Sequence, residues 1–68
     1  MTIELNGERL ELDGRKTVSE ALELAGVAAE RRGIAVAVDG EVVPRSRWPR
    51  TELADGQRVE IVGAIQGG

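Results

Sequence analysis

The stretch TIELNGERLEL, residues 2–12, alternates apolar and polar side chains on both sides of a central Asn6-Gly7 pair. Alternation with a period of two is typical of a strand that buries one face. Asparagine and glycine both tolerate positive φ, which a two-residue type I′ turn requires. We therefore predict a β-hairpin whose return strand runs over residues 8–13, with the large apolar side chains of both strands on one face.

A helix is predicted to follow the hairpin. Thr17 and Glu20 have the spacing of a capping box, in which the two side chains satisfy early backbone amides of a helix. Four apolar residues then share one helical face by their spacing: Val18, Ala21, Leu22 and Ala25. Gly26 ends the helix, and we interpret residues 27–33 as a connection with room for one more helical turn over 28–30.

A second pair of strands is predicted around the tight turn at Asp39-Gly40. The preceding stretch IAVAV, residues 34–38, has β-branched side chains at every other position and alanines between them. This pattern indicates a strand buried on one face, with small side chains on the other. Residues 41–43 form the short return strand, which Pro44 ends because proline has no amide to pair.

The last strand is predicted over residues 57–62, after a turn at Asp55-Gly56. Its side chains divide into an inward set, Val59 and Ile61, and an outward set, Arg58, Glu60 and Val62. Hairpin, helix and returning strands in this order give the β-grasp arrangement, an α+β fold with a mixed four- to five-stranded sheet wrapped on one main helix. We expect the last strand to lie centrally, beside the first.

Composition limits the classes of function. The 68 residues include no cysteine and no histidine, so one small domain must rest on a hydrophobic core alone. The net charge of −3 argues against nucleic acid as the main partner, because phosphate binding needs a basic face. No apolar run approaches the ~20 residues that span a bilayer, and the N-terminus lacks the pattern of a signal segment. We expect a cytoplasmic protein without a membrane partner.

An arginine cluster surrounds Trp48, formed by Arg45, Arg47 and Arg50. One interpretation is a solvated loop. The other is an arginine-rich contact surface for an acidic protein partner, with Trp48 either an anchor or a plug in the core.

The residues AIQGG at 64–68 are expected to form a flexible C-terminal tail on a domain of residues 1–63. Glycine loses more backbone freedom on ordering than any other residue, so Gly67-Gly68 adds little to a fold. A peptide without side chains that ends in a carboxylate could instead thread into a narrow active site. The alternative is a frayed terminus.

Five segments in register resemble the ThiS sulfur-carrier family of thiamine biosynthesis. They are the Asn6-Gly7 turn, VAVDGEVV at 36–43, PRSRW at 44–48, LADGQRVEIV at 53–62 and the final QGG. Asp39 stands where asparagine is commoner in that family, and Gln57 stands where aspartate is commoner. Both positions lie in predicted turns, which tolerate either residue type.

The resemblance implies an ubiquitin-like carrier whose terminal carboxylate is the reacting group. A ubiquitin-activating-enzyme-like partner would use ATP to convert the Gly68 carboxylate to an acyl-adenylate. Sulfur from a persulfide donor would then give a thiocarboxylate, which a thiazole synthase draws upon. Gly67 would keep the approach narrow, and Ala64, Ile65 and Gln66 would complete the threading tail. The chain itself would be a cosubstrate, monomeric when free, with no bound cofactor or metal.

The side chains agree with a role as cosubstrate, because no nucleophile with an adjacent activating base is evident. Docking onto partners is assigned to the outward residues Arg58, Glu60 and Val62, together with Arg45 and Arg47. Three alternatives stay open: a small subunit like that of molybdopterin synthase, a protein modifier that forms isopeptide bonds, and an interaction module with an inert tail. The molybdopterin subunit would typically be longer and richer in aromatic residues.

The tail generates a first prediction. Backbone NMR relaxation on the isolated protein should give order parameters below about 0.6 for residues 66–68, against about 0.85 in the strands. The physical reason is that each free glycine avoids an ordering cost of roughly 1–2 kcal/mol. A tail as rigid as the last strand would contradict the expected threading.

Overall fold

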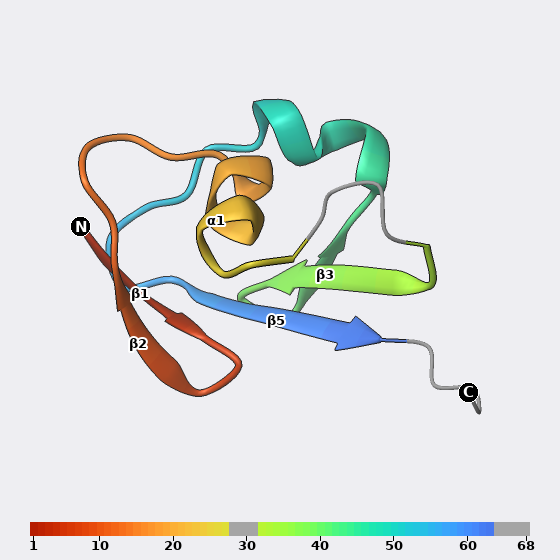
Figure 1. Ribbon diagram of the computed structural model, residues 1–68, viewed down its shortest axis with the longest axis horizontal. Helices are drawn as coiled ribbons and strands as arrows, with labels where there is room; N and C mark the ends of the chain where they lie inside the picture. The colour runs from red at the N-terminus through yellow and green to blue at the C-terminus, as the bar shows by residue number, and fades with distance from the viewer. Residues whose placement is uncertain (28–31, 64–68) are drawn as a thin grey trace.

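The computed structural model describes residues 1–27 and 32–63. In chain order the elements are β1 (Thr2–Leu5), β2 (Glu8–Glu11), α1 (Val18–Leu24), β3 (Ile34–Val38), β4 (Glu41–Val43), the 3-10 helix η1 (Arg45–Arg50) and β5 (Arg58–Gly63). The five strands form one sheet in the order β2-β1-β5-β3-β4. β1 and β5 run parallel, and the other neighbours run antiparallel. With α1 packed over the sheet (Figure 1), this confirms the predicted β-grasp fold and the central place of the last strand.

The first hairpin has the predicted turn and register. Asn6 and Gly7 have φ values of 49° and 83°, and Ile3 lies opposite Leu10. β2 ends at Glu11, however, two residues before the predicted end. Glu11 pairs with Thr2, the first residue of β1, and Leu12 still exchanges two hydrogen bonds of 2.7 Å with Met1, so the pairing stops one residue short of the predicted end.

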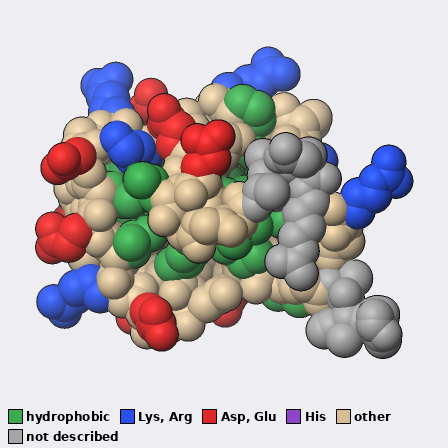
Figure 2. Space-filling view, in the orientation of Figure 1, with side chains coloured by type: hydrophobic (Ala, Val, Ile, Leu, Met, Phe, Trp, Pro, Cys, Tyr) green, Lys and Arg blue, Asp and Glu red, His purple; other side chains and the backbone are tan. Residues whose placement is uncertain are grey.

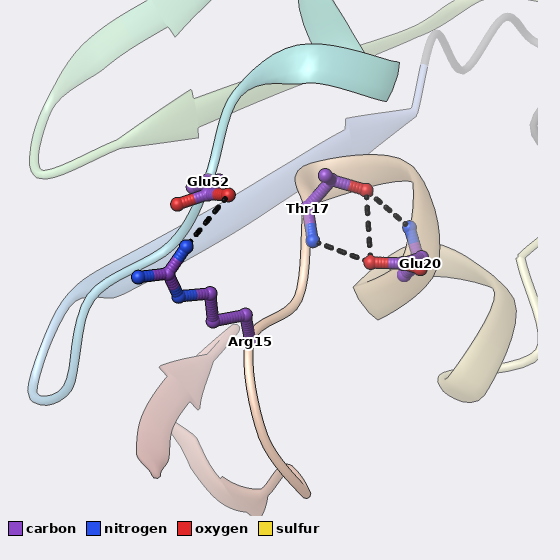
Figure 3. Close-up of polar contacts among 4 residues, drawn as sticks. All are labelled: Arg15, Thr17, Glu20 and Glu52. Carbon is purple, nitrogen blue, oxygen red and sulfur yellow. Dashed lines mark hydrogen bonds and ion pairs between the residues drawn. The ribbon is translucent and has the colours of Figure 1, made fainter.

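The helix α1 begins at the predicted capping box. Thr17 Oγ1 accepts a hydrogen bond from the Glu20 amide at 3.2 Å, and Glu20 Oε1 accepts one from the Thr17 amide at 2.8 Å (Figure 3). The prediction that Ala25 lies on the buried face is wrong, because the helix ends at Leu24 and Ala25 is its exposed C-cap. Gly26, with φ at 82°, ends the helix as predicted. The helical turn expected over 28–30 lies outside the described residues.

The core lies between the sheet and the two helices. Its most deeply buried members come from the three central strands, from α1 and from η1: Ile3, Val59, Val36, Val18, Leu22 and Trp48. Trp48 is 2% exposed, and its Nε1 donates to the Val43 carbonyl at 2.9 Å. Trp48 therefore packs in the core and is not exposed as an anchor for a partner. The segment around it is a 3-10 helix and not the loop of the first interpretation.

The two positions that depart from the family pattern contact each other. Gln57 Nε2 donates to Asp39 Oδ2 at 3.2 Å, and the Arg58 amide donates to Asp39 Oδ1 at 3.0 Å. The Asp39-Gly40 turn is thereby tied to the start of β5. An ion pair between Arg15 and Glu52 (Figure 3) is long at 3.9 Å and exposed, so it contributes little to stability. Of the helices described, none is long and apolar enough to cross a bilayer.

Two leucines on α1 provide a matched test of this core. Leu22→Ala should cost about 2–5 kcal/mol of unfolding free energy, because Leu22 is fully buried and its loss leaves a cavity. Leu24→Ala should change the unfolding free energy by at most about 0.5 kcal/mol, because Leu24 is 59% exposed. Urea unfolding followed by the fluorescence of Trp48, the chain's one tryptophan, measures both. Equal losses in the two variants would contradict this description of the core.

Candidate functional site

The sheet has an open face, which we define as the outward side chains of its strands on the side away from α1. Val36 of β3 and Val59 of β5 point inward to the core. Because side chains alternate along a strand, the residues on either side of each valine point to the open face. One half of it is apolar and consists of Ala35, Ala37, Val42 and Val62. The register places Ala35 opposite Val62 and Ala37 opposite Val42, so these side chains adjoin one another. Val42 is 71% exposed and Val62 is 62% exposed, which makes this half an uncovered apolar strip.

The other half of the open face is charged. Arg58 Nε donates to Glu4 Oε1 at 3.2 Å, and Arg9 lies opposite Glu4 on β2. These three residues and Glu60 help to line a hollow of about 650 Å³. The Arg58–Glu4 pair is well exposed, so it adds little stability and leaves both charges accessible to a partner.

Charge on the molecular surface is mixed in sign. In the space-filling view of Figure 2, acidic and basic side chains are interspersed around the rim, with apolar side chains between them. A mixed surface of this kind suits recognition of another protein better than binding to a polyanion.

The root of the tail, which we define as residues 61–63, is held by both neighbouring strands. On one side β3 pairs Ile34 with Gly63 and Val36 with Ile61. On the other side the Asn6 amide donates to the Val59 carbonyl at 2.9 Å, and the Ile61 amide donates to Asn6 Oδ1 at 2.7 Å. The last described residue of β5 therefore lies in the middle of the sheet rather than at an edge.

The predicted site residues fall into three groups. Arg58, Glu60 and Val62 point outward on the open face as expected. Arg45 and Arg47 lie on η1 instead, so the five proposed docking residues do not form one surface. The Arg45 guanidinium lies 4.5 Å from the centroid of the Trp48 ring. The tail residues Ala64, Ile65, Gln66, Gly67 and Gly68 lie outside the described residues.

Of the two η1 arginines, Arg47 lies beside the open face, whereas Arg45 lies toward the helix side of the sheet, where Ile34 packs against the core. Arg45 lines a hollow with Ile34, the residue that pairs with Gly63 at the root of the tail. Arg47 lines another hollow together with Val42 of the apolar strip. Arg47 is thus placed to contact a partner that covers the apolar strip, and Arg45 lies near the strand residue that pairs with the root of the tail.

Sequence reasoning missed Ala35, Ala37, Val42 and Asn6 as site residues. The first three could have been found. A two-residue turn at Asp39-Gly40 sets Val38 opposite Glu41, and it therefore sets Ala37 opposite Val42 on the face that the valines of β3 avoid. The role of Asn6 carried no such signal, because its partner lies 55 residues away in the chain.

Two of the described hydroxyl groups have structural roles. Thr17 caps α1, and the Thr51 hydroxyl donates to the Arg47 carbonyl at 2.7 Å. The described residues contain no cluster of three or more acidic, cysteine or histidine side chains that could hold a metal ion.

The sequence model of the ThiS family matches residues 3–68. The sulfur carrier protein ThiS of Thermus thermophilus is 44% identical over 64 residues, which cover 94% of this chain and 95% of that protein. The sulfur carrier protein ThiS of Escherichia coli is 29% identical over the whole of both chains. A thiazole synthase of Paramagnetospirillum magneticum is 35% identical over the full length of this chain, which corresponds to 20% of that protein.

Two solved structures are similar to this chain over its whole length. The crystal structure of the thiamine biosynthesis protein ThiS from Geobacter metallireducens aligns over 100% of both chains with a TM-score of 0.81 and 31% identity. A solution NMR structure of a thiamine biosynthesis protein from the same organism aligns with a TM-score of 0.76 and 34% identity, over 100% of this chain and 88% of that one.

Proposed function

This chain belongs to the ThiS family, and from that premise we propose that it is a sulfur carrier for thiamine biosynthesis. The observation that carries the proposal is the family match over residues 3–68, which includes the Gly-Gly end. The curated relatives named above are ThiS proteins or a thiazole synthase. They favour a thiamine role over that of a molybdopterin-synthase subunit. We take the protein to act in the cytoplasm as a cosubstrate rather than as an enzyme.

The proposed chemistry takes place at the carboxylate of Gly68. An oxygen of that carboxylate attacks the α-phosphorus of ATP on an adenylating partner, which forms the acyl-adenylate and releases pyrophosphate. The outer sulfur of a persulfide donor then attacks the acyl carbon and displaces AMP, which gives an acyl disulfide. A thiol that cleaves this disulfide releases the thiocarboxylate and is itself oxidised to a disulfide. Five residues follow Gly63 and can extend by at most about 18 Å, enough to reach a recessed active site while the domain stays outside it.

A thiazole synthase is the proposed acceptor of the sulfur. In the Paramagnetospirillum magneticum relative, a segment similar to this whole chain forms part of a protein named thiazole synthase. Such a combination supports a carrier domain that works beside a thiazole synthase.

The open face is the proposed docking surface for both partners. Its apolar strip adjoins the root of the tail, because Val62 directly precedes Gly63. Arg58 and Glu60 extend the surface along β5. Arg45 and Arg47 flank it from η1, where they can meet acidic side chains of a partner.

The carboxylate chemistry is tested by moving the carboxylate. Deletion of Gly68, or addition of one alanine after it, should reduce pyrophosphate release by the cognate adenylating enzyme to background. The fold should be unchanged, because neither alteration touches the core. Pyrophosphate release with ATP measures the first effect, and circular dichroism checks the second. Normal turnover of the unprocessed, extended chain would refute the proposal.

The docking surface is tested by a pair of exposed apolar residues. Val62→Asp should weaken binding to the adenylating enzyme and to the thiazole synthase by about tenfold or more, the loss of over 1 kcal/mol expected for an interface anchor. Leu24→Asp is the matched control, because Leu24 is similarly exposed but lies on α1, away from the open face. Calorimetric titration measures both affinities. If Val62→Asp binds as the unaltered protein does, or if Leu24→Asp loses as much, this surface is not the docking site.

A further inference from the structure

Two turn residues hold the last strand by their side chains. Asn6 and Asp39, with φ at 49° and 51°, are the only residues other than glycine with positive φ in the part of the chain that the structure describes. Each begins a two-residue hairpin turn and is followed by glycine. Asn6 Oδ1 accepts a hydrogen bond from the Ile61 amide, and Asp39 Oδ1 accepts one from the Arg58 amide. β5 is therefore fastened near both of its ends.

The Asn6 side chain replaces a backbone group of the parallel ladder. The Glu4 amide of β1 donates to the carbonyl of Gln57, just before β5, and the amide of Asn6, just after β1, donates to the Val59 carbonyl of β5. In a regular parallel pair the next bond would run from the Ile61 amide to the backbone carbonyl of Asn6. The left-handed turn at Asn6 takes this carbonyl out of line, and Oδ1 occupies its place at 2.7 Å from the Ile61 nitrogen.

The hydrogen bond from the Ile61 amide to Asn6 Oδ1 holds the C-terminal end of β5 against the β1 side of the sheet. Successive amides of a strand point to opposite neighbours, so the Ile61 amide points to β1 while the amides beside it point to β3. The bond from Ile61 is the last described contact between β5 and the β1 side before Gly63. Without it the root of the tail is held from the β3 side only, and its end can swing away from the sheet.

We propose that Asn6 is a positioning residue that fixes the direction in which the tail leaves the domain, whereas Asp39 serves the fold alone. This inference rests on the proposed carrier function, in which the tail must enter a partner. A loosely held root presents the carboxylate in many directions. The partner must then use part of its binding free energy to align the tail. Because the aligned complex is the same once it has formed, KM for the carrier rises while kcat stays constant.

Three variants separate positioning from stability. Asn6→Gly removes Oδ1 while it keeps a residue that accepts positive φ. Asn6→Asp retains an acceptor oxygen, and Asp39 shows that aspartate is accommodated at such a φ. Asp39→Gly is the matched control at the far end of β5, and it gives up at least as many hydrogen bonds because Asp39 also accepts from Gln57.

The measurements are amide hydrogen exchange of the free protein and steady-state pyrophosphate release with the adenylating enzyme, both well below the unfolding temperature. In Asn6→Gly, exchange at Ile61 should be about tenfold faster, and KM for the carrier should rise about three- to tenfold at constant kcat, as the loss of one hydrogen bond predicts. Asn6→Asp should restore both values. Asp39→Gly should lower the unfolding midpoint at least as much and leave KM unchanged.

The positioning role is overturned if KM of Asn6→Gly equals that of the unaltered protein, if Asp39→Gly raises KM equally, or if Asn6→Asp fails to restore it. The failure of the proposed function looks different, because then the unaltered chain itself releases no pyrophosphate. In that case hydrogen exchange at Ile61 and Gly63, which needs no partner, still tests whether Asn6 holds the root of the tail. Unchanged amide exchange at these residues in Asn6→Gly would refute the positioning role of Asn6.

Discussion

The position of β5 between β1 and β3 is the constraint on which the rest of the structure depends. This strand pairs in parallel with the first strand of the chain and antiparallel with the third, so it joins two hairpins that would otherwise share no hydrogen bonds. Its inward side chains, Val59 and Ile61, contribute to the core between sheet and helix. Because both of its edges are used, the end of β5 is held between two neighbouring strands, which gives the tail a firm base.

The layer that covers the inner face of the sheet consists of two short helices, α1 and η1. α1 has only seven residues, a length that is not stable in isolation. It depends on its capping box, on the burial of Val18 and Leu22, and on η1, which supplies Trp48. The tryptophan takes the place of several smaller side chains in a core without other aromatic residues. The inward faces of α1 and η1 are thereby engaged in packing, and the docking surface that we propose lies on the opposite side of the sheet.

Most of the fold could be predicted because its signals are local. The Asn6-Gly7 and Asp39-Gly40 turns, the alternation in IAVAV and the capping box at Thr17 each depend on residues within a few positions of one another. The failures had causes at longer range. The end of β2 depended on where β1 begins, and the exposure of Ala25 depended on where the helix stops. The contacts of Asn6 and Asp39 with β5 join residues 55 and 19 positions apart, which no spacing rule reveals. On the candidate site, the outward residues of β5 followed from alternation, whereas the separation of Arg45 and Arg47 from them required the path of η1.

The parallel pairing of β1 with β5 also has a mechanical consequence. A partner that draws on the tail pulls β5 along its own axis, while the neighbouring strands resist in the opposite direction. The hydrogen bonds from Glu4 and Asn6 to β5 are then loaded in shear, all at once, rather than opened one after another as in a peeled hairpin. Bonds that share a load must break together, so a pull along β5 meets both of these hydrogen bonds at once. In the carrier role that we propose, this geometry would hold β5 in the sheet while a partner draws on the tail.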